Sequence, residues 1–239
     1  MMIFEGALSV KAALESEYRS VKMLYLDEKK KDRDISYMIS LAKRNNVPVR
    51  FMKREVLNEM ASGRTHGGVL CEVGERTFQQ LDECLEGKPF ICVLEGVEDP
   101  FNLGYALRTL YSAGCTGVLL KKRDWSYSES VICRSSAGAF EKIRIVQSEQ
   151  LGEDLLKLKK QGLKLFCAYR KDAVSYFEAD FDTPLILAIG GEMRGLSREV
   201  LELCDEAVYI PYANDFRNAL NASSAVAALS YEILRQRSK

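Results

Sequence analysis

Several features on which whole classes of protein depend are missing from this sequence of 239 residues. It has a single histidine and no pair of cysteines spaced Cys-x-x-Cys, so a zinc site of the usual composition is not expected. Lys+Arg and Asp+Glu are equal at 34 each, so no overall positive field marks a simple polyanion binder. No apolar run approaches the about 20 residues that a membrane-spanning helix needs. An enzyme with a local basic groove is still compatible with this composition.

The cysteines and the first residues indicate the compartment. The seven cysteines are odd in number, and most lie in apolar runs such as Phe90–Val93. This pattern predicts buried free thiols in a reducing, cytoplasmic environment. Met1–Gly6 have neither a cationic lead nor a long apolar core, so a secretion signal is not expected. For the single histidine, His66, a structural or RNA-surface role is favoured over catalysis.

Alternating helix and strand patterns divide the sequence into two α/β regions. Residues 1–73 predict a small α/β domain, whose first helix covers residues 8–14 and whose first strand covers residues 21–26. Residues 74–88 are polar with glycine near both ends, and they predict a linker that carries a short helix. Residues 89–239 alternate more strongly and predict a parallel-sheet α/β domain. The strands predicted in this second domain are 90–95, 117–120, 143–146, 164–168, 185–190 and 206–210, and the helices are 103–113, 128–135, 149–161, 197–203 and 222–237.

Three stretches that lead from a strand into a helix carry the candidate chemistry. They are Asn102–Arg108, Leu187–Ser197, and Tyr209–Pro211 together with Asn218–Ser223. An open parallel sheet gathers its ligand groups at the carboxyl ends of its strands, so we expect these stretches to lie together.

The first stretch combines an amide with a cation. Asn102 is expected at the start of the helix, where its side chain can cap free backbone N–H groups. Arg108 lies one turn beyond Gly104, where a guanidinium can clamp a phosphate or a ribose edge. An ordinary N-cap followed by a surface arginine explains the same residues.

The second and third stretches suit a flat polar ligand. Gly190 and Gly191 permit close approach of the backbone to a ring such as a purine, and Glu192 offers a carboxylate. In the third stretch Asn221 can fix a polar group. The alternatives are a helix-entry loop capped by Ser197 and a loop capped by Asn221 or Ser223.

Taken together, in this order and spacing, the three stretches resemble the signature motifs of the SpoU/TrmH-type RNA ribose 2′-O-methyltransferases of the SPOUT class. The resemblance covers residues 90–237 and includes Ser136–Ala139. Residues 1–73, with the segment 65–69, resemble the L30e-like substrate-binding domain of many members. The resemblance implies a trefoil knot in the second domain and a homodimer whose active site combines groups from both chains. The stripe of Ala225, Ala228, Leu229 and Ile233 on the last helix suits such a helix-packed dimer.

The resemblance also implies the site. S-adenosylmethionine is expected to bind at Gly190, Ile210 and Leu220, with no metal. Asn102, Arg108, Glu192 and Asn221 match the catalytic or substrate-positioning residues of the family. The sequence departs from the family at Ala219, where members usually have a serine.

The function expected from this resemblance is methyl transfer to a ribose 2′-hydroxyl of RNA. Ribosomal RNA is favoured over transfer RNA because of the added N-terminal domain. One alternative is a catalytically weak or silent RNA-binding module, which Ala219 supports, and another is a nucleotide-binding α/β enzyme of a different type. Lys121–Arg123, followed by Trp125 and Tyr127, suit contact with single-stranded RNA, although an ordinary solvated surface explains them equally well.

Overall fold

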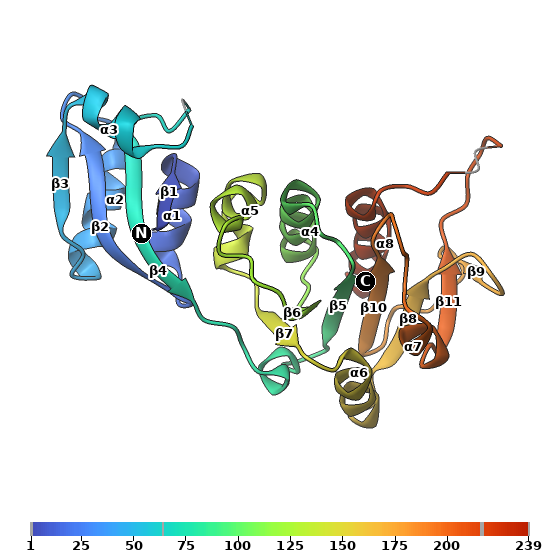
Figure 1. Ribbon diagram of the computed structural model, residues 1–239. Helices are drawn as coiled ribbons and strands as arrows, with labels where there is room; N and C mark the ends of the chain where they lie inside the picture. The colour runs from blue at the N-terminus through green and yellow to red at the C-terminus, as the bar shows by residue number, and fades with distance from the viewer. Residues whose placement is uncertain (1, 64, 216–217, 239) are drawn as a thin grey trace. The chain divides into compact units, whose positions relative to one another are not determined.

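The computed structural model of the protein describes residues 2–63, 65–215 and 218–238, which form two compact units (Figure 1). The N-terminal unit consists of Met1–Thr77 and Trp125–Lys142. The C-terminal unit consists of Phe78–Asp124 and Ile143–Lys239. Each unit is built around its own sheet.

The N-terminal unit has a four-stranded sheet of order β1-β4-β2-β3. β4 pairs antiparallel with both β1 and β2, and β3 is added to β2 in parallel. The strands are β1 (Met2–Glu5), β2 (Arg19–Asp27), β3 (Val49–Met52) and β4 (Val69–Arg76), and the helices are α1 (Ala7–Glu15), α2 (Arg33–Arg44), α3 (Arg54–Met60), α5 (Glu129–Ser135) and the short η2 (Ala139–Glu141). The helix predicted at 8–14 and the strand predicted at 21–26 are confirmed as α1 and β2, whereas β1 was not expected.

Local sequence accounts for the limits of α2. Asp32 caps its start, because the side-chain carboxylate accepts a hydrogen bond from the Ile35 N–H at 2.9 Å. The helix ends at Arg44, Asn45 is its C-cap, and Asn46 takes the left-handed conformation with φ of 55°. Its buried residues recur at helical spacing and face the core of the unit: Ile35, Met38, Leu41 and Ala42.

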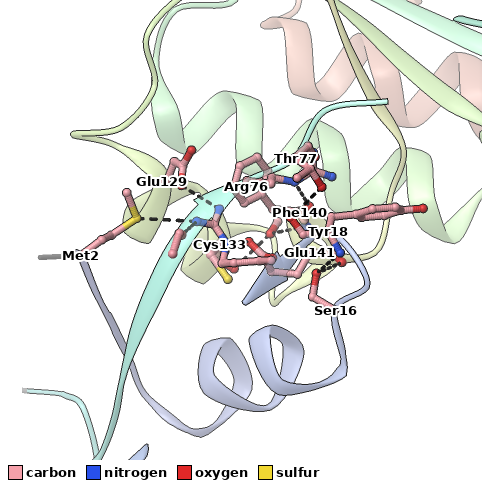
Figure 2. A network of polar contacts seen from close by, with 12 residues as sticks. Met2, Ser16, Tyr18, Arg76, Thr77, Glu129, Cys133, Phe140 and Glu141 are labelled. Carbon is pink, nitrogen blue, oxygen red and sulfur yellow. Dashed lines mark hydrogen bonds and ion pairs between the residues drawn. The ribbon is translucent and has the colours of Figure 1, made fainter. Parts of the chain in front are cut away.

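A buried ion-pair network fastens Trp125–Lys142 to the N-terminal sheet. The guanidinium of Arg19, on β2, is fully buried. Its Nη2 lies 2.7 Å from Glu129 and its Nε lies 2.9 Å from Glu141, both of which belong to the inserted segment (Figure 2). Its Nη1 donates to the carbonyl of Gly74 at 2.7 Å. Breaking such a buried pair by removing one partner costs about 3–5 kcal/mol, so the segment is an integral part of this unit.

A second arginine, Arg76, contacts the same inserted segment. Arg76, at the end of β4, donates from Nε to the carbonyl of Phe140 at 3.2 Å (Figure 2). Its guanidinium lies 5.1 Å from the ring centres of both Tyr18 and Phe140. Burial lowers the pKa of Arg76 to about 10. Burial also raises the pKa of Glu129, although the adjacent Arg19 opposes this shift.

The C-terminal unit has a seven-stranded sheet of order β7-β6-β5-β10-β8-β11-β9. Every pair of neighbouring strands is parallel, as the sequence predicts. The strands are β5 (Phe90–Glu95), β6 (Gly117–Lys121), β7 (Ile145–Ser148), β8 (Lys164–Ala168), β9 (Val174–Ser175), β10 (Leu185–Gly190) and β11 (Glu206–Tyr209). The helices are α4 (Pro100–Ser112), α6 (Leu151–Lys160), α7 (Arg198–Glu202), α8 (Ala222–Arg237) and the short η1 (Leu81–Cys84). The short β9 was not expected.

The start of α4 corrects one expectation. The helix begins at Pro100, and Asp99 caps it by accepting the Asn102 N–H at 2.7 Å. Proline at the first helical position has the required φ and no N–H to leave unpaired, which explains the earlier start. Asn102 is therefore inside the first turn, and its side chain is not the cap.

The expectation of free and mostly buried cysteines is confirmed. All seven cysteines are free, and six of them are buried. Burial raises the pKa of the Cys92 and Cys133 thiols, which keeps both protonated and unreactive. Among the residues that the structure describes, no helix combines the length and apolar character that crossing a bilayer demands.

We predict that the Glu129→Gln substitution changes how stability depends on pH. Because burial raises the folded-state pKa of Glu129 above 4.5, the wild type loses unfolding free energy as the pH rises from 4.5 through that folded pKa. Glutamine does not titrate, so the stability of the variant relative to the wild type should increase over this window. Urea titrations at several pH values, followed by fluorescence of the only tryptophan, Trp125, measure this difference. A difference that does not vary with pH would contradict the prediction.

Candidate functional site

The carboxyl ends of β5 and β10 form the centre of the candidate site. The two strands are paired in parallel, with Gly190 opposite Glu95 (Figure 1). The N–H of Gly191 donates to the carbonyl of Glu95 at 2.7 Å. The Glu95 carboxylate also accepts the N–H of Ser197 at 2.8 Å. Glu95 thus holds both ends of the loop from Gly191 to Ser197.

This loop presents Glu192 to Asn102. Gly191 and Gly195 form a bridge, with the Gly195 N–H 2.9 Å from the Gly191 carbonyl, so the residues between them make a tight turn. From α4, the Asn102 Nδ2 donates to Glu192 Oε1 at 3.2 Å. Two predicted catalytic residues that are 90 positions apart in sequence are therefore brought into direct contact.

Two cavities adjoin this pair. One, of about 300 Å³, is lined by Asn102 and Glu192 together with Asp99. The other, of about 470 Å³, is lined by all three predicted cofactor residues, Gly190, Ile210 and Leu220. The cavities share lining residues: Gly191, Glu192, Arg194 and Ala222. A ligand in the larger cavity can therefore reach a second ligand that contacts Asn102 and Glu192.

The glycines are needed for a close approach of backbone to backbone. A Cβ atom on Gly190 would lie 2.3 Å from the carbonyl carbon of Gly195. One on Gly191 would lie 2.0 Å from the carbonyl oxygen of Gly96. The close neighbours are thus backbone atoms of Gly195, in the same loop, and of Gly96, in the loop after β5.

Two capping interpretations are confirmed. The Ser197 hydroxyl caps α7 by accepting the Val200 N–H at 3.4 Å. The Asn221 Oδ1 caps α8 by accepting the Ser224 N–H at 2.8 Å, and it also accepts the Ser223 hydroxyl at 3.2 Å. The oxygen of Asn221 therefore faces the helix, which leaves its Nδ2 on the opposite side of the amide.

Arg108 is not brought to the Asn102–Glu192 pair. Its side chain is exposed, and among the described residues it has no hydrogen-bond or ion-pair partner. On the same helix, Phe101, Tyr105 and Tyr111 are 46–48% exposed. The apolar stripe on α8, which was expected to pack in a dimer, packs within the chain. Leu229 and Ile233 are fully buried, and α8 packs against α4.

The contacts of His66 and of the basic stretch at 121–127 indicate which interpretation fits each of them. His66 is buried, with Nε2 2.9 Å from Asn58 Oδ1 and Nδ1 accepting the Gly68 N–H, which supports the structural interpretation. In the basic stretch, Lys122 pairs with Glu149, and Arg123 lies 3.6 Å from Glu98. Tyr127 is 94% exposed. Within the described ranges, no cluster of three or more His, Cys, Asp or Glu residues could hold a metal ion.

Sequence reasoning missed Glu95. It ends a buried strand and precedes Gly96, whose φ is 73°. A carboxylate at the end of an otherwise apolar strand is a signal that could have found it, because such a group needs donors nearby.

Comparison with known proteins gives matches to both parts of the chain. Residues 89–231 match the model of the SpoU rRNA Methylase family. Residues 3–79 match the model described as RNA 2'-O ribose methyltransferase substrate binding. A relative from Pseudomonas putida, 23S rRNA (guanosine-2'-O-)-methyltransferase RlmB, is 33% identical over 97% of this chain and 95% of its own length. The protein of the same name from Shewanella oneidensis is 30% identical over 98% and 97%.

Solved structures share the fold over the whole chain. The crystal structure of an RNA 2'-O ribose methyltransferase has a TM-score of 0.81 at 25% identity, and it covers 100% of this chain and 89% of that one. The SpoU methyltransferase AviRb from Streptomyces viridochromogenes, solved with the cofactor AdoMet, also has a TM-score of 0.81, at 24% identity. Its match covers 100% of this chain and 91% of that one.

We predict that Gly191→Ala destabilises the C-terminal unit by about 1–3 kcal/mol, because the added methyl group meets backbone that cannot move aside. Gly152→Ala, in α6, is the matched control. There the added methyl group meets only the Oε1, Cδ and Cγ atoms of the exposed, flexible Glu199 side chain, and alanine favours the helix. Denaturant unfolding of both variants measures the effect. Equal unfolding midpoints for the two would show that the close approach at Gly191 is not needed.

Proposed function

The chain belongs to the SpoU rRNA Methylase family, and we propose that it transfers a methyl group from S-adenosylmethionine to a ribose 2′-hydroxyl of ribosomal RNA. One observation carries the proposal. The Asn102–Glu192 pair lies next to the cavity that is lined by Gly190, Ile210 and Leu220. This arrangement places groups that can orient a hydroxyl next to a space for a nucleoside.

The larger cavity fits the cofactor. Its volume of about 470 Å³ lies in the usual range for small-molecule pockets. Leu196, Ile210 and Leu220 supply apolar walls for a purine ring, and the backbone at Gly190 supplies polar groups without a side chain in the way. When bound, the cofactor supplies a methyl group on a positively charged sulfur.

The chain's own residues position the hydroxyl. Aligning an attacking oxygen with a methyl group is mainly a problem of orientation, and such positioning contributes a large share of a rate enhancement. The hydrogen bond from Asn102 fixes Glu192, and the turn held by Glu95 fixes the backbone beneath it. Both side chains line the smaller cavity, where they can hold a ribose edge.

We further propose that Arg108 acts across a homodimer. It lies on an exposed face of α4 with Phe101 and Tyr105, and a second copy of the chain would bury these rings. In such a dimer the guanidinium can reach the partner's site, where a fixed positive charge stabilises the alkoxide that develops on the hydroxyl. Asn221, whose Nδ2 faces away from α8, is proposed to position the substrate.

The rest of the organisation is proposed on the same basis. The match of residues 3–79 to a substrate-binding model supports RNA reading by the N-terminal unit. We propose the division of function expected from the sequence, with an RNA-binding domain at 1–73, a linker at 74–88 and a methyltransferase domain at 89–239, except that Trp125–Lys142 belongs to the N-terminal unit. A trefoil knot in the last domain and action in the cytoplasm complete the proposal.

A catalytically silent RNA-binding module is the second candidate. Ala219, which lines the larger cavity, has no hydroxyl to offer a ligand. A calorimetric titration with S-adenosylhomocysteine separates the two functions. Binding supports the methyltransferase, and RNA binding without any cofactor binding supports the module.

Our first functional prediction is that Asn102→Ala and Arg108→Ala each reduce methyl transfer by about 100-fold or more, the usual effect of removing a group that stabilises the transition state. The assay is incorporation of labelled methyl groups into ribosomal RNA. Arg198→Ala is the control, because Arg198 is an exposed arginine on α7 that pairs with Glu202. If either site variant matches the control, its assignment is wrong.

The second functional prediction concerns the shared active site. The wild type should be a dimer by light scattering. Co-refolding equal amounts of Asn102→Ala and Arg108→Ala chains should restore about a quarter of wild-type activity, because half of the dimers are mixed and each mixed dimer has one intact site. A mixture as inactive as its components would place both residues in one chain's site.

A further inference from the structure

Tyr212 links the two sides of the larger cavity. It follows β11, in the segment Ile210–Tyr212, whereas Leu220 immediately precedes the cap of α8. The N–H of Leu220 donates to the Tyr212 phenol oxygen at 2.9 Å. Both residues line the cavity, and Tyr212 is half-buried. This hydrogen bond joins the segment after β11 to the segment before α8.

Arg170 supports the same contact from a third segment. It follows β8, and its guanidinium lies 4.6 Å from the centre of the Tyr212 ring. Its Nη2 donates to the carbonyl of Asn218 at 3.5 Å, so the cation contacts both sides of the link. A guanidinium over an aromatic ring is attractive and restricts the ring's orientation. The segments after β8 and β11 and before α8 are thereby held together at one wall.

Ala219, which lies between Asn218 and Leu220, has no side-chain group that could make such a hydrogen bond. Ala219 has a methyl side chain and is exposed in the cavity wall. The hydrogen bond that the Leu220 N–H makes at this wall therefore goes to a side chain from another segment. The phenol of Tyr212 is the group that meets this backbone.

We propose that Tyr212 is a positioning residue for the cofactor, an inference that rests on the proposed methyltransferase function. Its phenol holds the Leu220 backbone at the cavity wall, and Arg170 holds the ring. Substrate RNA contacts the Asn102–Glu192 side, so Tyr212 governs cofactor binding and leaves RNA binding unchanged.

The test compares Tyr212→Phe with Tyr212→Leu in the full-length protein. Phenylalanine removes only the hydroxyl, and loss of one hydrogen bond should weaken S-adenosylmethionine binding about three- to tenfold. Leucine also removes the ring beneath Arg170, so its affinity should fall further. Calorimetry gives the affinity, and steady-state kinetics should show a raised KM for the cofactor with an unchanged KM for RNA.

Tyr176→Phe is the matched control, because it removes a phenol hydroxyl near β9 from a residue that does not line the cavity. Its cofactor affinity should equal that of the wild type. Wild-type affinity in Tyr212→Phe would overturn the positioning role, and so would an equal rise in both KM values with a lower Tm, which indicates a merely structural residue. A wild-type protein that binds no cofactor would instead overturn the proposed function.

Discussion

The close approach of bare backbone at the ends of β5 and β10 is the constraint on which the site depends. With no side chain at Gly190 or Gly191, the loop after β10 can lie against Gly96 and turn back upon itself. This proximity lets Glu95 hold both ends of the loop, and it brings Glu192 within hydrogen-bonding distance of Asn102. The contact between the Glu192 carboxylate and the Asn102 amide therefore depends on the absence of side chains at Gly190 and Gly191.

Sequence patterns predicted this part of the molecule well because its signals are local. An apolar strand such as Phe90–Glu95 and a glycine-rich exit such as Gly190–Gly191 are each visible within a few residues. The start of α4 was placed too late, since Asp99 and Pro100 together form a stronger start signal than Asn102. The contact between Asn102 and Glu192 follows only once β5 and β10 are known to be neighbours.

Contacts between distant segments were beyond the reach of these patterns. Nothing near Arg19 indicates that its partners are Glu129 and Glu141, 110 and 122 residues away. The inserted segment was therefore not expected in the N-terminal unit. Likewise, the periodicity of α8 showed an apolar face but not its partner, and Leu229 turned out to pack inside the chain. The charge balance of the whole chain was equally uninformative, because it does not show that Arg19 pairs with Glu129 and Glu141 in the interior.

The Arg19 network has a consequence for how such proteins can evolve. The chain passes between the two units three times, after residues 77, 124 and 142. A gene fusion that replaced only the first 77 residues would supply a new sheet without the cation that neutralises Glu129 and Glu141. Exchange of N-terminal domains by recombination is thus restricted to donors that carry a matching charge at this position. The gene segments that encode residues 1–77 and 125–142 are therefore expected to be inherited together.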